Sequence, residues 1–465
     1  MKYIQRLVLL ATMGLTFSSC DKFIEGYDVN PNLPQDAPAE QQLTAVQINE
    51  GFVLSGEMTR VAGIWSDYFT GADRQYQGLD VYTTAAGDYD NMWANTYQLT
   101  LANARLVQDK ARAVNNFYLL GIAQVLEAQM IGTATALWGD VPYSEAFRPN
   151  QPPKFDSQAS VYAAVQTLLD QAIQNLGKTG INPGDRDIYY GGDLGRWQAA
   201  AHSLKARYYL HTKNYQQAAV EARLGIGSPD GDMLMPYNGN FTVDANPYAD
   251  FLDYNRVGYM SAEGAYAVDL LDPAGSTPRA NAKTNEAGRF NYFYTTNGYF
   301  SVDPNFLDGA FAPDADFPLM SYVETQAILA EALARTGDAG GALIALNNIR
   351  STNAAFFAQI DPAADYDAYT LTDFAPGGII NGGAATANDA LLKEILTEKY
   401  LSLVGQIEPF NDIRRTNNLI GVPKKNANSP NLPQRYLIAQ SEVNTNPKTP
   451  AFAGGVLFEK TPINR

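Results

Sequence analysis

Cysteine and histidine are almost absent from this chain. Of its 465 residues one is a cysteine, Cys20, and two are histidines, so an internal disulfide and a cysteine-based zinc site are both excluded. His202 and His211 do not have the four-residue spacing of a helical zinc motif, and no Ser/His/Asp set or glycine-rich phosphate loop is visible. We therefore expect structural histidines, no metal, no cofactor and no catalytic residues.

Basic residues are also scarce, with 33 Lys and Arg against 49 Asp and Glu, for a formal charge of −16. A nucleic-acid partner needs a basic face that releases counterions, so nucleic acid is not expected as a ligand. The acidity also disfavours polyanionic substrates. Neutral ligands fit this composition better.

Long apolar runs are missing after the N-terminal segment, where Lys2 and Arg6 precede an apolar stretch that ends at "LTFSSC". This pattern predicts a signal peptide over residues 1–19. Cys20 directly after it resembles the lipobox of bacterial lipoproteins, which implies lipid attachment at Cys20. The alternative is an ordinary signal peptide with a stray cysteine. Residues 20–38, rich in Pro, Asn and Asp, are expected to form an extended leader.

The rest of the chain is rich in helical periodicity, which predicts a mainly α fold. Helices are expected at 117–138, at 156–176 and at 388–405. Two helical hairpins, "GRWQAAAHSLKARYYLHTKNYQQAAVEARLGIG" and "YVETQAILAEALARTGDAGGALIALNNIR", register with each other when Asn214 aligns with Asp338. Their paired small residues resemble the tetratricopeptide repeat.

A single domain is expected over 39–465. Its helical scaffold would cover about 94–226 and 319–350. Loop-rich, ligand-facing segments would cover about 66–93 and 228–318, where Gly, Pro, Asn, Asp and Tyr show little periodicity. A C-terminal helix and an irregular tail would complete it over 388–465.

Five landmarks in order resemble the SusD/RagB family of nutrient-binding outer-membrane lipoproteins. They are Cys20, "YDNMWANTYQLTLANARLV", "ATALWGDVPYSEAF", "ETQAILAEALARTGD" and "LTEKYLSLVGQIEPFNDIRRTN". The resemblance implies a SusD-like fold, a SusC-like TonB-dependent transporter as partner, and a glycan as ligand without catalysis. Lys399 and the run Gln406–Glu408 depart from the larger branch of the family, so the chain looks like a divergent member.

The stretch "ALWGDVPYSEAF" has the composition of an active site, but a structural turn explains it better. Gly139 and Pro142 can end a helix, Trp138 and Tyr143 can seal that end, and Asp140 can bond backbone amides. The other tryptophans also lie in helical patterns, so core packing is expected for them.

Tyrosines gather where periodicity is lost and form the candidate ligand platform. Flat rings in loops can stack on the apolar faces of sugars, while amides and charged groups bind hydroxyls. The candidate rings are Tyr76, Tyr82, Tyr89, Tyr292, Tyr294 and Tyr299, with Arg74, Asn91 and Asn297 as polar partners. The alternative is that "NYFYTT" forms a half-buried strand.

The sequence therefore predicts a lipid-anchored protein of the outer membrane that faces the cell exterior, binds an oligo- or polysaccharide and delivers it to the transporter as a lid. Three alternatives stay open: a surface glycoside hydrolase, capture of a peptide or another nutrient, and a structural adaptor. The acidic turns Asp230/Asp232 and Asp314/Asp316 could hold calcium, although neither continues into an EF-hand pattern.

Overall fold

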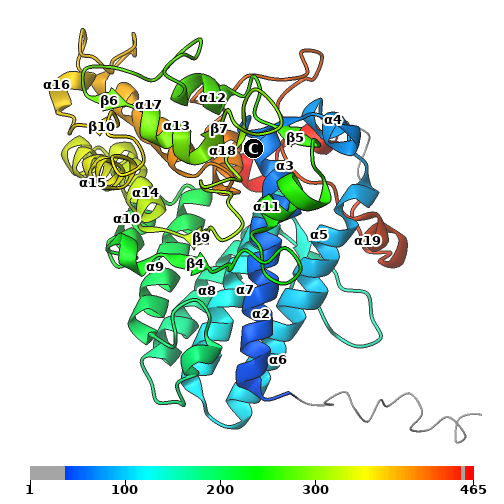
Figure 1. Cartoon of the computed structure of the whole chain (residues 1–465). Coiled ribbons are helices and arrows are strands. Elements are labelled where there is room, and N and C mark those ends of the chain that lie inside the picture. The colour runs from blue at the N-terminus through cyan, green and yellow to red at the C-terminus, as the bar shows by residue number, and fades with distance from the viewer. Residues whose placement is uncertain (1–36, 452–455) are drawn as a thin grey trace, which may run out of the picture.

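Helices form most of the computed structural model, which describes residues 37–451 and 456–465; Cys20 and the expected signal peptide lie outside them. Long helices make up the lower part of Figure 1, and the upper part combines further helices with long loops. The helices are α2 (Ala39–Ser55), α3 (Glu57–Trp65), α4 (Arg74–Asp80), α5 (Asp90–Ala94), α6 (Ala102–Ala113), α7 (Phe117–Trp138), α8 (Gln158–Leu176), α9 (Leu194–His211), α10 (Tyr215–Ala222), α11 (Pro247–Ala249), α12 (Tyr266–Leu271), α13 (Ala287–Phe293), α14 (Tyr322–Arg335), α15 (Ala339–Phe357), α16 (Leu371–Phe374), α17 (Ala387–Ser402), α18 (Glu408–Arg415) and α19 (Gln440–Thr445).

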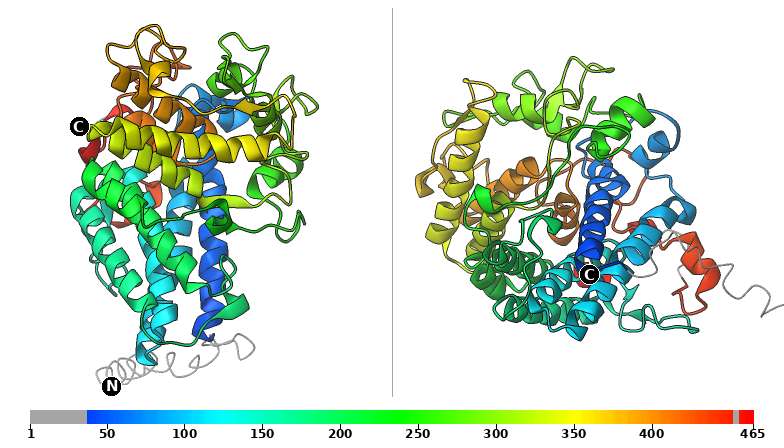
Figure 2. Two further views of the ribbon diagram at one scale, coloured as in Figure 1. Left: turned by 90° about the vertical axis from the view of Figure 1, so that its left-hand side faces the viewer. Right: turned by 60° about the horizontal axis from the view of Figure 1, so that its bottom comes forward.

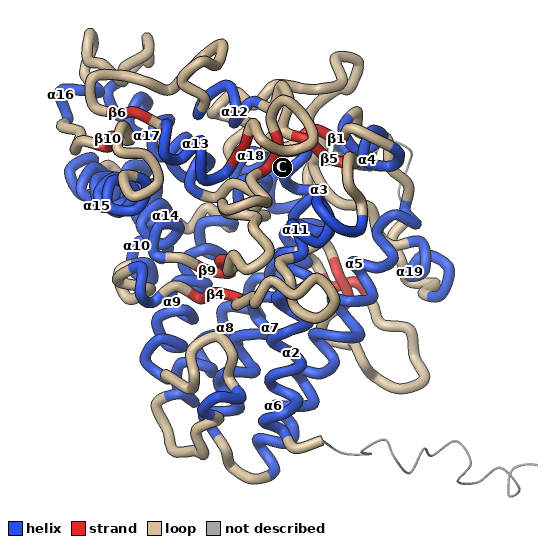
Figure 3. Tube along the Cα trace, in the orientation of Figure 1, coloured by secondary structure: helices blue, strands red, loops and turns tan. Residues whose placement is uncertain are grey.

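The strands are short, and in the described part of the chain they form five two-stranded antiparallel sheets. Figure 3 shows them as small red patches between helices and loops. The strand pairs are β1 (Thr70–Gly71) with β5 (Met260–Ser261), β2 (Val141–Pro142) with β3 (Phe155–Asp156), β4 (Met233–Met235) with β9 (Phe317–Met320), β6 (Thr284–Asn285) with β10 (Asp365–Tyr366), and β7 (Tyr294–Thr295) with β8 (Asp303–Pro304).

Helix α7 is the central helix, and the sequence explains both of its ends. The Asn116 side chain caps it by accepting a hydrogen bond from Leu119 N at 3.3 Å. From Leu119 onwards all of its residues are buried. Gly132 lets Tyr208 of α9 approach, because an added Cβ would lie 2.3 Å from the tyrosine ring. The helix ends at Gly139, whose φ of 85° is a conformation that glycine adopts easily.

Both predicted hairpins are present, as α9 with α10 and as α14 with α15. The aligned residues Asn214 and Asp338 have the same role, because the side chain of each caps the second helix of its hairpin. The small residues that face the partner helix are fully buried, including Ala206, Ala218 and Ala330. The tetratricopeptide-like pattern is therefore confirmed.

Successive helices pack on one another from α7 through α8, α9, α10 and α14 to α15 and α17. In the left view of Figure 2, α14 and α15 lie across the long axes of the cyan and green helices below them. This arrangement places the α14–α15 hairpin beside the loop-rich segments of the upper part. All four tryptophans are buried, which agrees with the packing roles expected for Trp138 at the helix end and for the other three in helical patterns.

The turn after α7 ties three distant segments together. Trp138 is fully buried and donates from Nε1 to Leu437 O at 2.8 Å. Asp140 Oδ1 accepts a hydrogen bond from Gln158 N, the first residue of α8, at 2.8 Å. Pro142 pairs with Phe155 in the β2–β3 sheet. Tyr143 lies 4.9 Å below the Arg105 guanidinium. These contacts are those of a structural turn.

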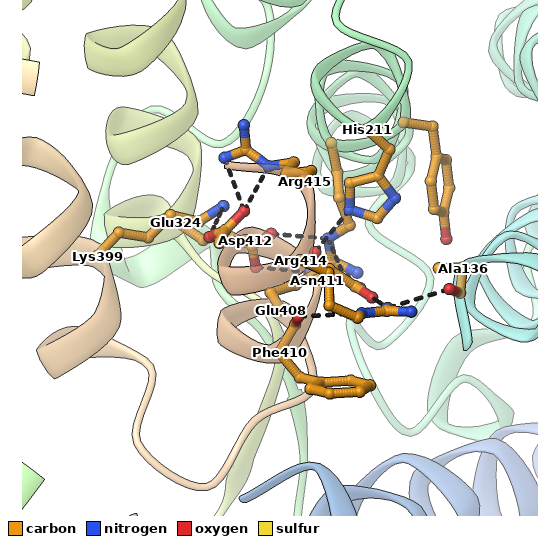
Figure 4. A network of polar contacts seen from close by, with 12 residues as sticks. Ala136, His211, Glu324, Lys399, Glu408, Phe410, Asn411, Asp412, Arg414 and Arg415 are labelled. Carbon is orange, nitrogen blue, oxygen red and sulfur yellow. Dashed lines mark hydrogen bonds and ion pairs between the residues drawn. The ribbon is translucent and has the colours of Figure 1, made fainter. Parts of the chain in front are cut away.

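A buried polar network around α18 joins the scaffold to the C-terminal region (Figure 4). The Arg207 guanidinium binds both oxygens of Glu324, at 2.7 and 2.6 Å, and Arg415 binds Glu331. Asp412 pairs with Lys399 at 2.9 Å. Since these groups come from α9, α14, α17 and α18, the network fixes four helices relative to one another.

Both histidines lie on α9. His202 pairs with Glu221 at 2.6 Å, and His211 lies between Tyr162 and Glu408. Both are held inside the scaffold, which agrees with the structural role expected of them.

The C-terminal tail is irregular and wraps the body, as expected. Tyr436 N donates to Leu137 O at 2.9 Å. Lys425 forms ion pairs with Asp80 at 2.6 Å and with Asp67 at 3.2 Å.

In the described ranges, no helix has the length and apolar character needed to span a bilayer.

Candidate ligand-binding cavity

The first tyrosine group is part of the core, which corrects the prediction of a surface platform there. Tyr76 is 2% exposed, and its hydroxyl accepts a hydrogen bond from Arg60 Nε at 3.0 Å. The Tyr82 hydroxyl accepts one from Lys425 N at 2.9 Å. Tyr89 is fully buried against Tyr436. Large rings gain more from burial than from exposure, so the aperiodic segment folds inward and presents none of these rings to a ligand.

The second group divides three ways. Tyr294 lies in β7 and is 1% exposed, so its assignment to the platform was wrong and the half-buried strand describes it better. Tyr292 is half-buried at the end of α13 and lines a cavity. Tyr299 is 55% exposed. Only Tyr292 and Tyr299 are therefore available to a ligand in this conformation.

The predicted polar partners are exposed but are not gathered in one place. Arg74 lies at the start of α4, with its guanidinium 5.7 Å from the Tyr259 ring centre. Asn91 borders a small pocket of about 200 Å³ beside Arg60, and Asn297 lies in the turn after β7. None of the three lines the large cavity described next.

A cavity of about 1160 Å³ lies where the α14–α15 hairpin meets the loop-rich segments. Its walls come from the residues around β4 and β9, from the end of α13, from the end of α15 and from the link between α17 and α18. Phe356 and Leu307 in its lining are 44% and 48% exposed, so the cavity opens to the surface. The volume suits a ligand larger than a single small molecule.

One wall of the cavity is aromatic. Tyr292 lies 5.0 Å from Phe356 and 5.0 Å from Phe293 between ring centres, both nearly edge-on. Phe357 continues this wall 5.1 Å from Phe356, and Phe311 lies 6.4 Å from Phe293. Helix α15 packs against α14 through the buried residues that precede its last turn. This packing places the two consecutive phenylalanines of the last turn at the cavity.

Four aspartates, Asp232, Asp308, Asp314 and Asp316, also line the cavity, while the lining contains no lysine or arginine. Asp232 is half-buried, and its Oδ1 accepts a hydrogen bond from Tyr322 N at 2.6 Å. Burial raises the pKa of Asp232 to about 7; the Tyr322 N–H opposes this shift, and the nearby Asp230 and Glu324 carboxylates add to it. The other three aspartates are exposed.

The floor of the cavity holds two polar side chains that make no hydrogen bond within the described residues. Gln406 is 8% exposed, and its carboxamide has no partner. The Ser402 Oγ is also buried without one. Buried polar groups are normally paired, so this floor offers unused hydrogen-bonding capacity next to the cavity.

An aromatic rim, made of Phe241, Tyr254, Tyr299 and Phe306, lies next to the cavity. Tyr254 and Tyr299 are exposed, Phe241 is half-buried, and Phe306 is buried. Phe241 and Tyr254 stack at 5.3 Å with a 19° angle, and Tyr299 stacks on Phe306 at 5.5 Å with a 13° angle. Tyr299 donates its hydroxyl hydrogen to Asp253 Oδ1 at 2.5 Å, which joins the two pairs.

The rim and the cavity share the same segments of chain. Leu307, directly after Phe306, lines the cavity. The loop that carries Phe241 ends at Asn246, whose N donates to Pro313 O and whose Nδ2 donates to Ala315 O, both at 2.8 Å. Pro313 and Ala315 flank the cavity residue Asp314, so the rim extends the cavity along the surface.

Residues from both acidic turns line this cavity, but they do not form a metal centre. Within residues 37–451 and 456–465, no group of three or more His, Cys, Asp or Glu side chains could hold a metal ion. The cavity thus presents flat rings, carboxylates and amides, the groups that bind polar ligands by stacking and hydrogen bonds.

Residues 32–437 match the family model described as SusD-like, "Starch-binding associating with outer membrane". The chain belongs to the SusD-like family. The SusD-like fold extends to solved structures, although their low identities support the fold alone. A SusD/RagB family protein from Bacteroides thetaiotaomicron is 23% identical with a TM-score of 0.68, covering 89% of this chain and 95% of that one.

Two further structures resemble this SusD-like protein to a similar degree. A SusD homolog from Bacteroides fragilis is 18% identical over 92% of this chain and 100% of that one, with a TM-score of 0.67. A chitin-binding SusD homolog from Flavobacterium johnsoniae is 18% identical over 88% and 94%, with a TM-score of 0.66. The comparison with curated proteins returned no match.

Sequence reasoning about this SusD-like protein missed most of the cavity. Asp232, Asp314 and Asp316 belong to acidic turns whose sequence does not indicate a saccharide site, and no sequence pattern assigns a binding role to Asp308, Phe356 or Gln406. One signal was available: two Asp-containing turns, at 230–232 and 314–316, each immediately precede a short apolar run. If those two apolar runs pair as strands, both turns flank the same two-stranded sheet. This is the arrangement of β4 and β9.

Proposed function

We propose that this SusD-like protein captures an oligo- or polysaccharide at the outer membrane, in the cavity and along its aromatic rim. The observation that carries the proposal is the open cavity of about 1160 Å³ beside two stacked ring pairs, each of which contains one exposed tyrosine. Membership of a family described as starch-binding and associated with the outer membrane supports it.

The rings and the polar groups would act on different parts of a sugar. Aromatic faces such as that of Tyr254, which is 56% exposed, can stack on the apolar face of a sugar ring. Carboxylates and amides that line the cavity, among them Asp308 and Gln406, can accept hydrogen bonds from hydroxyls or donate to them. Such contacts hold a ligand without making or breaking a covalent bond.

Delivery to a SusC-like TonB-dependent transporter completes the proposal. A lipid on Cys20 would hold the protein at the outer membrane with its cavity toward the cell exterior, and the protein would act as a lid. Capture and docking need only favour compatible conformations, so no chemical step is required. A peptide or another nutrient remains the alternative cargo.

One observation favours a second function, glycoside hydrolysis. The pKa of Asp232, raised by burial to about 7, is in the range of a general acid. Glycosidases need a second carboxylate about 5 to 9.5 Å away. Asp316, however, lies at the other end of the β4–β9 ribbon, about four residues or about 13 Å along it. Reducing ends released in an overnight digest would establish hydrolysis.

Titration of the purified protein against a panel of soluble glycans and peptides tests the capture function. We expect binding to at least one glycan, lowered on the order of tenfold in Tyr254→Ala and Phe356→Ala, because each loses a large ring contact. Phe147→Ala is the matched control, since Phe147 is 44% exposed and absent from the lining of the cavity. The proposal is contradicted if no glycan binds, or if all three variants lose the same amount of affinity.

A further inference from the structure

The cavity has a negatively charged lining, and the protein itself does not neutralise that charge. Asp232, Asp308, Asp314 and Asp316 line it without a lysine or arginine, and none of them forms an ion pair with any residue that the structure describes. Arg207 donates from Nη2 to Leu319 O in the adjoining strand and also binds the Glu324 carboxylate through Nη2 and Nε. The positive charge next to this strand is therefore already paired.

The spacing of the carboxylates fits an extended ligand better than a single ion. Asp232 and Asp316 are about 13 Å apart along the β4–β9 ribbon, because Asp232 precedes Met233 while Asp316 precedes Phe317, the partner of Met235. Calcium needs its oxygen ligands within about 2.6 Å. A chain with charges at intervals can instead contact several of these carboxylates.

The aromatic wall and the floor of the cavity each add a feature that suits a cationic sugar. The exposed face of Phe356 attracts cations through its ring quadrupole. Gln406, more than nine-tenths buried and without a hydrogen-bond partner in the described chain, presents a carboxamide to the cavity. Its oxygen can accept from an ammonium group and its nitrogen can donate to a hydroxyl.

We propose that this cavity prefers saccharides with free, protonated amino groups over neutral saccharides of the same length. The preference rests on the proposed capture function and names its ligand class. Amino-sugar oligomers combine flat ring faces, which match the stacked pairs of the rim, with regularly spaced ammonium groups, which match the carboxylates. A basic peptide shares the charge but lacks the flat saccharide faces.

The test compares two oligosaccharides that differ only in N-acetylation. Glucosamine oligomers, in buffer acidic enough to protonate their amines, and N-acetylglucosamine oligomers of equal length are titrated against the purified protein by calorimetry. We expect the amine-bearing oligomer to bind on the order of tenfold more tightly, as charge-assisted hydrogen bonds allow. Added salt should weaken only that binding.

Variants locate the preference within the cavity. Asp314→Asn with Asp316→Asn, both exposed and therefore tolerant of change, should bring the two affinities close together and leave the acetylated oligomer unaffected. Asp109→Asn, an exposed carboxylate on α6, is the matched control and should keep the preference.

The outcomes separate this proposal from the capture function. If the acetylated oligomer binds and the amine-bearing oligomer binds no more tightly, the proposed charge preference is wrong, whereas the capture function is supported. If no saccharide of any kind binds, capture itself fails. If lysine oligomers bind and glucosamine oligomers do not, the cavity is a peptide site and the saccharide class is overturned.

Discussion

Glu408 and His211 are 197 positions apart in the sequence, yet Glu408 Oε2 lies 2.8 Å from His211 Nε2 inside the protein. Tyr162 closes the other side of the imidazole, at 3.0 Å from Nδ1. Glu408 also faces Arg207, at 3.7 Å. The start of α18 is thereby fixed to the end of α9, which holds the nearby residue Gln406 in the cavity floor.

Replacement of Glu408 should therefore be costly to stability. Glu408→Gln keeps the shape but removes the charge opposite Arg207, and breaking a buried pair in this way costs about 3–5 kcal/mol. Denaturant unfolding should show this loss in the free energy of unfolding. Asp109→Asn, which breaks an exposed pair, serves as control and should change it by less than about 1 kcal/mol. Equal effects would mean that the network around α18 does not stabilise the fold.

The same network predicts sensitivity to acid. Burial alone would raise the pKa of Glu331, but Arg415, with Arg335 and Lys399, outweighs it and lowers that pKa from 4.5 to about 2. The pKa of Glu408 is also held well below its usual range: burial raises it, but His211 and Arg207 outweigh burial.

Because both pKa values are lowered by folding, the stabilisation is complete above about pH 4.5 and is lost as the pH falls toward 2. For Glu331 the difference between 4.5 and about 2 corresponds to about 3 kcal/mol. Glu331→Gln should be less stable than the unmodified protein at neutral pH and should lose less on acidification, as measured by unfolding at a series of pH values. Parallel curves for the two proteins would contradict this assignment.

The scaffold was predictable from sequence because its information is local. Helix α7 begins and ends at the residues that its cap and its glycine indicate, and Asn214 and Asp338 mark the two hairpins. The departures at Lys399 and Glu408 were visible as differences from the family pattern. Their pairing with Asp412 and His211 was not, because those contacts form only after distant helices pack.

The candidate site was harder to predict because it is assembled from four separate segments. The density of tyrosines correctly indicated that loop-rich segments contribute to the site. It did not indicate which rings are exposed, because the burial of each ring depends on how its loop folds back. Tyr89 and Tyr299 have similar surroundings in sequence, and one is fully buried while the other is 55% exposed. The cavity also uses the end of α15, a helix whose sequence is explained by packing alone.

The turn at Asp140 should matter for stability and not for ligand affinity. Asp140→Ala removes the acceptor for Gln158 N at the start of α8, a loss of about 1 kcal/mol for a capping contact. Asp140→Asn keeps an acceptor oxygen and should lose less. Thermal unfolding would rank the three proteins, and glycan titration of the folded variants should give unchanged affinities. A well-folded Asp140→Ala protein that no longer binds would assign the turn to the ligand site.

Gln406 offers the opposite separation of stability and binding. The residue is 8% exposed, and its carboxamide makes no hydrogen bond in the described chain. Gln406→Leu therefore removes no hydrogen bond within the protein and should change the free energy of unfolding by less than about 1 kcal/mol. The affinity for a bound glycan should fall on the order of tenfold, since a ligand hydrogen bond is lost.

Gln158 is the matched control, because it is fully buried but uses its carboxamide twice, donating to Thr135 O at 2.8 Å and accepting from Ile463 N at 2.9 Å. Gln158→Leu should therefore lose stability, by about 1–3 kcal/mol for each group left unpaired, and should keep its glycan affinity. Denaturant unfolding and calorimetric titration of both variants decide the question. If Gln406→Leu loses stability and keeps its affinity, the unpaired carboxamide does not serve the ligand, and the floor of the cavity is only a packing surface.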